Sequence, residues 1–554
     1  MAFEKRVQRI EGKYKYETPI SLNKMSADDH LLSDQRSNVE LYDVEETAGR
    51  KGVTVTLHLL LSMIVACLGS LQYGYHMGEL NAPQDYITCK AGSDPRYRDS
   101  FLGRFGLSEC IEMSESQFGL VTSVFSIGGL IGSLVAGPLA DKYGRKPISY
   151  WNCGFGMLGS ALLFISNSYY EMLFGRLLVG VSCGSLIVVT PLFINEMSPS
   201  SLKGSLGSMN QVSINCGILV TQSLAIAWAN MLQWRWILLF GGIISFVNFI
   251  LLFRISESPK WLVSRGNITD AEDVLSQLRG GSRQESRQEI NGWIQGSQPQ
   301  PVRSFRDLEA HTNAQQDLGV TQNLARPSST RSSLRDYETF SLLEYFNDPK
   351  YRYPRRVIST ILMAQQFCGV NSIIFYGVKV IKKAFPNTAI IINFGVSIVN
   401  VLVTFFSSPL VDRWGRKPLL ICSSTLMALC SFMICIGIVN SIPLILAVFV
   451  VLYITAFACG LGPIPFLIIS ELSHPETVGT AQSYGTTMNW IATFIVGYGF
   501  PALNSVIDGY VFLLFSGVAA CFSLYVYRFV PETKGKLDYT DIWKSIDPRV
   551  AYSQ

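Results

Sequence analysis

The sequence is poor in charge. Asp, Glu, Lys and Arg make up only 16% of its 554 residues, whereas hydrophobic residues make up 48% and the mean hydropathy is +0.27. A soluble domain typically carries about 25% charged residues. The composition therefore indicates a membrane protein, in which the net charge of +4 matters less than the placement of basic residues in loops.

Patterns typical of metal sites and enzymes are also missing. The chain has 12 cysteines and 5 histidines, yet it contains no Cys-x-x-Cys pair and no His/Cys cluster with the spacing of zinc ligands. We find neither a nucleophile paired with a base nor a glycine loop that would hold phosphates. We therefore expect no metal, no cofactor, no nucleic-acid partner and no enzymatic activity.

The first residues lack an early apolar run. Residues 1–52 are polar and carry both signs of charge, which predicts a disordered cytosolic tail without a cleavable signal peptide. Within this tail, residues 28–32 read Asp-Asp-His-Leu-Leu and look like an acidic dileucine sorting signal. The alternative is a chance pair of leucines in a disordered segment.

Twelve apolar runs of about 20 residues follow, and that is the length a bilayer core requires. They cover about 53–75, 118–140, 148–167, 174–194, 206–229 and 234–253, and then 357–380, 390–411, 419–439, 444–469, 481–503 and 510–530. This predicts an all-α membrane protein of twelve transmembrane helices in two six-helix bundles, 53–254 and 357–530. A cytosolic loop at 255–356, with short helices and a disordered Ser/Arg-rich part, joins the bundles, and a cytosolic tail covers 531–554.

A basic turn occurs twice. Residues 138–147 read Pro-Leu-Ala-Asp-Lys-Tyr-Gly-Arg-Lys-Pro, and residues 409–418 read Pro-Leu-Val-Asp-Arg-Trp-Gly-Arg-Lys-Pro. Each copy joins the second apolar run of its half to the third, which indicates an internal duplication. Basic residues collect in cytosolic loops, so both termini and the central loop are predicted to be cytosolic.

One sizeable loop, at about 83–116, faces the opposite side and contains Cys89 and Cys110. A disulfide between them would close a loop of roughly 20 residues and stabilise the protein by about 3 kcal/mol. The sequence leaves both the disulfide and two free thiols open.

Polar side chains inside the apolar runs are candidate functional residues, because at membrane depth they cost free energy unless they are paired or line a wet cavity. Amides suit an uncharged, polyhydroxylated substrate, since they both donate and accept hydrogen bonds, and an aromatic ring can cover the apolar face of a sugar. The alternative for any single amide is hydrogen bonding between helices. The candidates are Gln211, Gln365, Gln366, Asn371, Asn400, Asn489 and Trp490.

With these motifs the chain resembles the sugar porters of the major facilitator superfamily, close to the facilitative glucose transporter pattern. The matching motifs lie at 73–84, at both Asp-x-x-Gly-Arg-Lys turns, and at 175–176, 191–196, 257–260, 365–371, 462–465 and 531–535. Details at 79–83, 183–188 and 365–369 resemble a fungal subgroup linked to the vacuole. The resemblance implies two bundles of inverted three-helix repeats that rock around a central site.

The resemblance also implies roles for individual residues. It places Gln211, Gln365, Gln366, Asn371, Asn400 and Trp490 at sugar-contacting positions, and Asn489 and Phe466 beside them. It implies a cytosolic charge network that holds the two halves together and favours the outward-open state. That network comprises Asp141, Arg145, Glu196, Lys203, Glu257, Asp412, Arg416, Glu471 and Glu532.

Several positions depart from the family pattern. Leu362 stands where close relatives have glutamine, Phe466 replaces a tryptophan, Ala458 replaces an acid, and Val478 replaces a cation of the charge network. These departures leave the identity of the sugar open and make the outward-open state less favoured.

His76 is the sharpest departure. Proton-coupled sugar porters have an aspartate there, near the arginine matched by Arg176, whereas facilitative glucose carriers have a neutral amide. Histidine titrates near neutral pH, and Glu79 lies one helical turn away as a partner. The alternative is a neutral histidine that only forms hydrogen bonds.

We therefore expect a monomer in a vacuolar-type internal membrane that moves a hexose or related sugar by facilitative transport. Two alternatives remain open. One is proton-coupled symport through His76 and Glu79. The other is a sugar sensor or vacuolar trafficking-linked protein that transports nothing.

Overall fold

The computed structural model describes residues 56–199, 202–296, 342–474, 477–536 and 539–544. All regular secondary structure in these residues is helical. The dileucine-like stretch at 28–32 and most of the Ser/Arg-rich segment lie outside the described residues.

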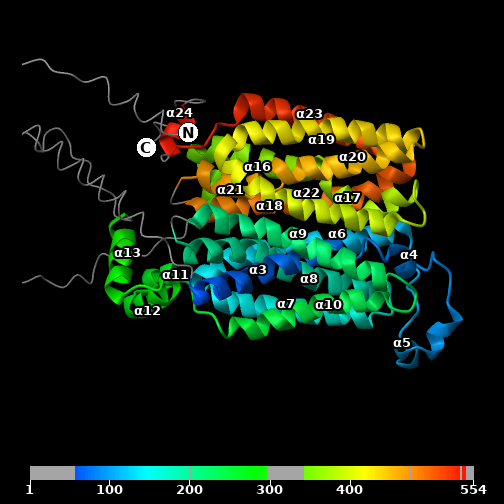
Figure 1. The fold of residues 1–554 in the computed structure, drawn as a ribbon, viewed down its shortest axis with the longest axis horizontal. Coiled ribbons are helices and arrows are strands. Elements are labelled where there is room, and N and C mark those ends of the chain that lie inside the picture. The colour runs from blue at the N-terminus through cyan, green and yellow to red at the C-terminus, as the bar shows by residue number, and fades with distance from the viewer. Residues whose placement is uncertain (1–55, 200–201, 297–341, 475–476, 537–538, 545–554) are drawn as a thin grey trace, which may run out of the picture. The chain divides into compact units, whose positions relative to one another are not determined.

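The first half contains six long helices (Figure 1). They are α3 (Leu57–Gly78), α6 (Glu115–Tyr143), α7 (Arg145–Ile165), α8 (Tyr169–Met197), α9 (Lys203–Trp228) and α10 (Trp234–Leu252). Three short elements lie between α3 and α6, namely α4 (Gln84–Ile87), η1 (Pro95–Asp99) and α5 (Phe101–Arg104). Three more follow α10, namely α11 (Pro259–Ser264), α12 (Ile268–Arg279) and α13 (Arg283–Gly296).

The second half repeats this plan with two of its membrane helices interrupted. Its long elements are α16 (Arg352–Phe367) with α17 (Val370–Lys382), α18 (Ala389–Trp414), α19 (Arg416–Val439), α20 (Pro443–Ala456) with α21 (Ile464–Leu472), α22 (Val478–Ile507) and α23 (Val511–Phe529). The short elements are α15 (Leu342–Asn347), η3 (Pro349–Tyr351), η4 (Phe457–Leu461), η6 (Asp508–Tyr510) and α24 (Tyr539–Lys544).

The number of membrane helices agrees with the sequence prediction. Ten stretches of the described residues are long and apolar enough to cross a membrane. The last of them, Val478–Phe529, contains both α22 and α23, and α9 is a further long helix that carries several polar side chains. Together these make the twelve helices that were predicted.

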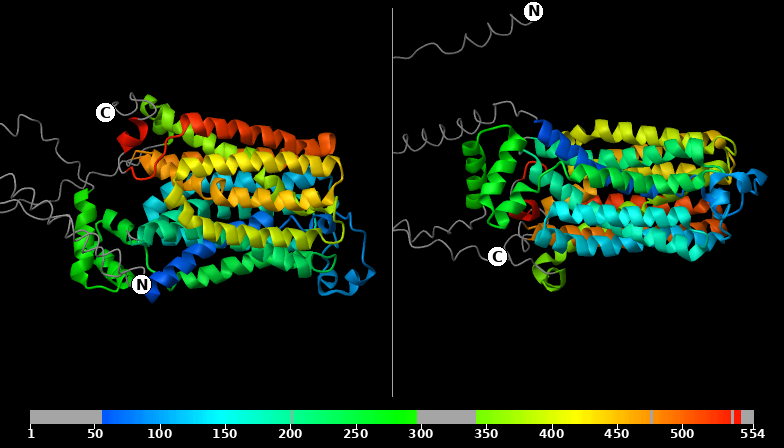
Figure 2. Two further views of the ribbon diagram at one scale, coloured as in Figure 1. Left: turned by 45° about the horizontal axis from the view of Figure 1, so that its top comes forward. Right: turned by 90° about the horizontal axis from the view of Figure 1, so that it is seen from below.

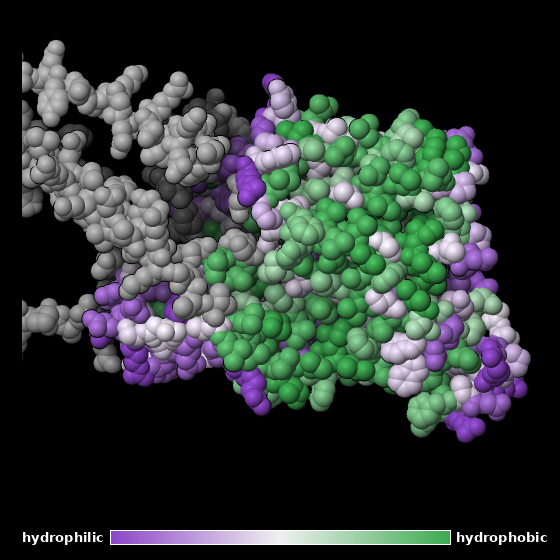
Figure 3. Space-filling view, in the orientation of Figure 1, coloured by the Kyte–Doolittle hydropathy of each residue, from purple (hydrophilic) through white to green (hydrophobic). Residues whose placement is uncertain are grey.

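The surface has the polarity of a membrane protein. In Figure 3 the middle of the helices is covered by hydrophobic residues, and hydrophilic residues gather at both ends. Large apolar side chains such as Trp151, Phe406 and Leu429 are 67%, 73% and 58% exposed. Lipid is the solvent that makes such exposure favourable.

The two ends of the helices carry different structures (Figures 1 and 2). One end bears both basic turns and the short helices α11–α13, and we call it the basic end. The other bears α4, η1, α5 and the two cysteines of the long loop, and we call it the disulfide end. Capping boxes start α6 at Ser114 and α8 at Ser168, and both helices start at the disulfide end.

Both interruptions in the second half have a local cause. Gly369 lies between α16 and α17 with φ +99°, and a Cβ there would lie 2.4 Å from the ring of Phe515. Only glycine suits this backbone conformation and this close approach. Between α20 and α21 the chain forms a π-helical turn, after which Pro463 starts the next helix. Both breaks place backbone carbonyls and amide side chains inside the bundle.

Candidate functional site

The predicted amide cluster lies at the break between α16 and α17. Gln365 and Gln366 end α16, and Asn371 begins α17. Asn489 reaches them from α22, and its Nδ2 donates to Gln365 Oε1 at 2.8 Å and to the Leu362 carbonyl at 3.0 Å. All four amides are at most 7% exposed. The structure therefore brings four of the predicted sugar-contacting residues together.

The hydrogen bonds distinguish these amides from one another. Gln365 Nε2 donates to the carbonyls of Leu461 and Gly462 at 2.8 and 3.2 Å, so this side chain ties α16 to the break between α20 and α21. Asn371 Nδ2 donates to Gln366 Oε1 at 2.6 Å. Asn371 Oδ1, in contrast, is buried without a hydrogen-bond partner among the described residues. Asn371 thus retains an acceptor that a hydroxyl could fill.

Trp490 joins the two halves at the middle of α22. Its ring meets Tyr73 of α3 and Phe125 of α6 edge to face, with centroid distances of 5.8 and 5.7 Å. Gly129 makes room for it, since a Cβ at that position would lie 2.6 Å from the indole. The indole Nε1 is buried and has no hydrogen-bond partner within the described part of the chain.

A second polar contact crosses between the halves where α9 meets α18. Asn215 Nδ2 donates to Thr404 Oγ1 at 2.7 Å and to Asn400 Oδ1 at 3.3 Å, and Gln211 Nε2 donates to Asn215 Oδ1 at 3.4 Å. Sequence reasoning missed Asn215, although it lies one helical turn after Gln211. Phe466, the remaining candidate, is half-buried on α21.

His76, Glu79 and Arg176 form a continuous triad inside the first half. His76 Nδ1 lies 2.8 Å from Glu79 Oε2, and Arg176 Nη1 lies 2.5 Å from Glu79 Oε1. Arg176 also donates to the His76 carbonyl at 3.0 Å and lies 4.6 Å above the ring of Phe125. All three side chains are at most 1% exposed. A buried charge is tolerated only when it is paired. Here Glu79 is paired through one carboxylate oxygen with His76 and through the other with Arg176.

Each basic turn builds the same clamp. In the first copy Gly144 has φ +105°, and Arg145 binds the Ala140 carbonyl at 3.0 Å, Glu196 at 2.8 Å and Asp141 at 3.1 Å. Glu257 accepts the backbone N–H groups of Arg145 and Lys146 at 3.1 and 3.0 Å. These contacts tie the ends of α6, α7 and α8 to the segment before α11.

The second copy repeats three of the first copy's contacts. Gly415 has φ +94°, Arg416 binds Glu471 at 2.8 Å and the Val411 carbonyl at 3.2 Å, and Glu532 accepts the N–H groups of Arg416 and Lys417, both at 3.0 Å. The side chains of Lys203 and Asp412 lie outside the described part. Each clamp lies within one half, so these contacts stiffen the halves separately. The contact between the halves that the resemblance implies concerns the outward-open state and stays a prediction.

Burial gives Glu257 an unusual environment. It raises the pKa of the Glu257 carboxyl above its ordinary value, and the N–H groups of Ser258, Lys146 and Arg145 act in the opposite direction. A Cβ at Gly144 would lie 2.4 Å from Glu257 Oε2, so the carboxylate fits only against a glycine. The backbone amides of the turn thus form a nest for this carboxylate.

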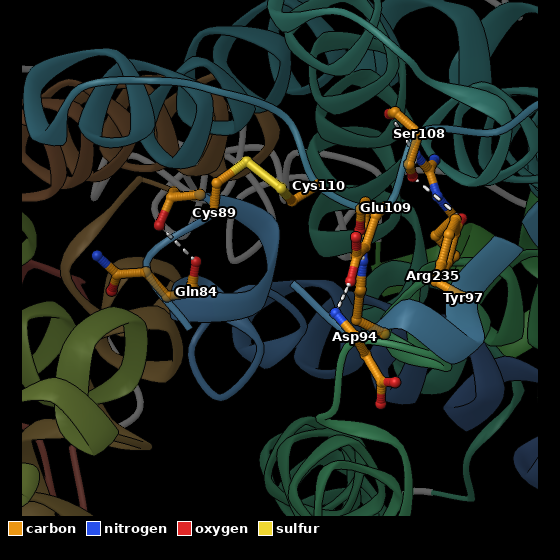
Figure 4. The surroundings of a disulfide bond; sticks show 10 residues. Gln84, Cys89, Asp94, Tyr97, Ser108, Glu109, Cys110 and Arg235 are labelled. Atoms are coloured by element: carbon orange, nitrogen blue, oxygen red, sulfur yellow. Dashed lines mark hydrogen bonds between the residues drawn. A yellow bond between two sulfur atoms is a disulfide. The ribbon is translucent and has the colours of Figure 1, made fainter. Parts of the chain in front are cut away.

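The loop at the disulfide end is fixed to the first half. Cys89 and Cys110 are bonded, with their Cα atoms 5.2 Å apart. Figure 4 shows Arg235 beside this loop, where it donates to the Ser108 carbonyl at 2.8 Å, and Tyr97 donates to the same carbonyl at 3.0 Å. Arg235 is fully buried, so these bonds hold the loop firmly.

Contacts from this end cross to α17 of the second half. Asn81 Nδ2 donates to the Ile374 carbonyl at 2.8 Å, and Asn81 Oδ1 accepts the Val378 N–H at 3.0 Å. Two ion pairs accompany it, Glu115 with Lys379 and Asp85 with Lys382. The two halves therefore meet at the disulfide end in this structure.

Comparison with known proteins identifies the family. Residues 62–538 match the family model described as "Sugar (and other) transporter". The chain belongs to this sugar transporter family. A Saccharomyces cerevisiae relative, "Probable metabolite transport protein YBR241C", is 48% identical over 493 residues, which cover 88% of this chain and 96% of the relative.

Further members of the sugar transporter family are similar along most of their length. "Vacuolar protein sorting-associated protein 73" of S. cerevisiae is 42% identical over 87% of this chain and 95% of the relative. "Facilitated glucose transporter protein 1" of Caenorhabditis elegans is 30% identical over 91% of this chain and 95% of the relative.

Solved structures show the same fold. The proton:xylose symporter XylE bound to 6-bromo-6-deoxy-D-glucose matches with a TM-score of 0.65 at 21% identity, over 86% of this chain and 97% of XylE. The inward-open form of XylE from E. coli matches with a TM-score of 0.63 at 20% identity, over the same two shares. The fold is that of the major facilitator superfamily, as the sequence predicts.

Proposed function

We propose that this member of the sugar transporter family carries a hexose or a related polyol across a membrane by facilitative alternating access. The observation that carries the proposal is a pair of buried polar atoms of opposite kind, the Asn371 Oδ1 acceptor and the Trp490 Nε1 donor, which have no partner among the described residues. A sugar hydroxyl both donates and accepts, so one substrate class satisfies both atoms. The name of the glucose-transporting relative supports this class.

Counterflow of labelled hexoses into liposomes containing the purified protein tests the proposal. We expect saturable exchange of one sugar, with or without a pH gradient. Asn371→Ala should raise the half-saturating concentration about tenfold, because one hydrogen bond contributes about 1.4 kcal/mol. Asn440→Ala, which alters an exposed amide at the C-cap of α19, is the matched control and should change nothing. Folded protein that exchanges no hexose would refute the proposal.

A second candidate is proton-coupled symport, and the His76, Glu79 and Arg176 triad favours it. Protonation of Glu79 would break its ion pair with Arg176, and this triad lies close to Asn81, which contacts α17. A proton could thus be linked to opening of the disulfide end. Under this mechanism His76→Asn abolishes sugar accumulation driven by a pH gradient and spares counterflow. Unchanged accumulation in that variant would exclude coupling through His76.

We further propose that the basic end faces the cytosol and that the protein acts in a vacuolar-type membrane as a monomer. The basic turns support the orientation, and the name of the vacuolar sorting relative supports the location. Fluorescence of a tagged chain in intact cells would test the location, and the same tag on Leu31→Ala/Leu32→Ala would test the sorting stretch.

A further inference from the structure

A group of buried polar side chains occupies the interior of the first half. They come from α3, α7, α8 and α10, and each is at most 3% exposed. We call this group the polar column. Its members are Gln72, His76, Asn152, Ser160, Ser182, Ser245 and Asn248.

Helical spacing lines these residues up. On α3, Gln72 and His76 are four residues apart, and on α7 so are Asn152, Gly156 and Ser160, which places each set on one face. His76 lies near the end of α3 at the disulfide end. Asn152 lies seven residues from the start of α7 at the basic end, which is about 10 Å. The polar column therefore extends over much of the membrane thickness.

Two glycines make room for the longest side chains. A Cβ at Gly156 would lie 2.3 Å from Gln72 Nε2, 2.6 Å from Ser245 Oγ and 3.2 Å from Ser182 Oγ, so three helices converge on this point. A Cβ at Gly241 of α10 would lie 2.2 Å from His76 Cε1. The packing is thus arranged to admit polar groups into this interior.

Most members keep polar atoms without a partner among the described residues. These atoms are both ends of the Gln72 amide, His76 Nε2, Asn152 Nδ2, Ser160 Oγ and Asn248 Oδ1. Each would cost about 1–3 kcal/mol if it were left unsatisfied, and the sum would approach the whole stability of an ordinary domain. The set contains both donors and acceptors. Water fits it better than an ion does, because water both donates and accepts.

We propose that the polar column binds a file of water molecules that conducts protons between the basic end and His76 Nε2. A proton from this water binds Nε2, the proton on Nδ1 passes to Glu79 Oε2, and the ion pair of Glu79 with Arg176 is broken. The charged groups at His76 are Glu79 on its own helix and Arg176 on α8. Tyr75 and Cys183 are titratable groups nearby, and Tyr376 of α17 interacts with Arg176. The residue of α10 that faces His76 is Gly241, which has no side chain to titrate.

This inference rests on the proton-coupled form of the proposed function, so its test has two readouts. The first is radiolytic hydroxyl labelling of the unmodified protein, which marks buried side chains that touch bound water. We expect label on His76 and none on the equally buried Met427 of α19, although methionine is the more reactive residue. An unlabelled His76 would overturn the water file, whatever the protein transports.

The second readout is sugar-driven proton uptake into liposomes, recorded with an internal pH dye beside sugar counterflow. Gln72→Leu and Asn152→Leu should each lower proton uptake at least tenfold and keep counterflow within about twofold of the parent, which also shows that they fold. Gln222→Leu, a buried amide of α9 outside the polar column, should keep both. Parental proton uptake in both column variants would overturn the proposal. So would a parent that exchanges sugar without moving protons. Absence of all sugar exchange alongside a labelled His76 would refute the proposed function and leave the water file supported.

Discussion

The contacts of Asn81 predict which residue keeps the disulfide end closed. Its amide binds the carbonyl of Ile374 and the N–H of Val378, and these two groups lie one helical turn apart on α17. When α17 moves away, the two backbone groups can bond to each other. Because this backbone bond can also form in the closed state once Asn81 is removed, loss of Asn81 costs the closed state one net hydrogen bond and leaves no buried group unsatisfied.

The magnitudes decide between Asn81 and its neighbouring ion pairs. One net hydrogen bond contributes about 0.5–1.5 kcal/mol. The side chains of Asp85 and Lys382 are 32% and 49% exposed, and such pairs contribute about 0–1 kcal/mol. We expect Asn81→Ala to shift the equilibrium toward opening of the disulfide end by about fivefold, at low and at high salt alike. Lys382→Gln should shift it by about twofold at most, and only at low salt.

Electron–electron double resonance between spin labels can measure this shift. Phe105 and Leu444 belong to different halves at the disulfide end and are 71% and 72% exposed, so both accept a label. Asn81→Ala should populate longer distances, and Asn440→Ala should not. Parental distances in Asn81→Ala, or a larger shift in Lys382→Gln, would refute the reasoning.

Three other predictions follow from close packing and covalent structure. Gly144→Ala should lower stability by about 1–3 kcal/mol, because its backbone has φ +105° and its Cβ would meet Glu257; a thermal unfolding scan in detergent would show this. Gly129→Ala should weaken sugar counterflow, because its Cβ would lie 2.6 Å from Trp490 and displace the indole. Cys89→Ser should lower stability by about 3 kcal/mol in the same thermal scan.

Matched controls exist for each of these predictions. Gly154 and Gly395 lie on membrane helices where a Cβ would meet nothing within 4 Å, so alanine there should be neutral in both assays. Adding Cys110→Ser to Cys89→Ser should cost little more, because the first change already removes the bond. A Gly144→Ala protein as stable as Gly154→Ala would contradict the argument from the turn.

The sequence predicts the fold well because its signals are local. Apolar length gives the spans, and the repeated turn gives the duplication. The basic turn at Gly144 and Arg145, however, shows why tertiary contacts cannot be predicted from local signals. The sequence places Gly144, Arg145 and Glu257 in motifs, but only the structure shows that Glu257 binds the backbone N–H of Arg145, more than a hundred residues away. Nothing in the spacing of a motif reveals which atoms of it are bonded.

The candidate site shows the same limit at finer scale. Sequence reasoning treats Gln365 and Asn371 as equivalent amides, because both interrupt an apolar run. In the structure Gln365 Nε2 donates to the carbonyls of Leu461 and Gly462, whereas Asn371 Oδ1 is a buried acceptor without a partner among the described residues. Gln72 went unnoticed for a related reason. Its neighbours in the polar column come from other helices, and periodicity along one helix carries no information about them.

The distribution of polar contacts also indicates how the two halves can move. The clamps of Arg145 and Arg416 close within their own halves and can stay intact in every conformation. The bonds of Asn81 and the Glu115 ion pair with Lys379 cross between the halves, so they must break when the disulfide end opens. Rigid halves joined by a few such contacts give an equilibrium between two states. Each crossing contact then contributes its own free energy to the closed state. Because the triad at Glu79 and the crossing bonds of Asn81 lie two residues apart at the end of α3, a change of charge on the triad acts directly on the contact that this equilibrium depends on.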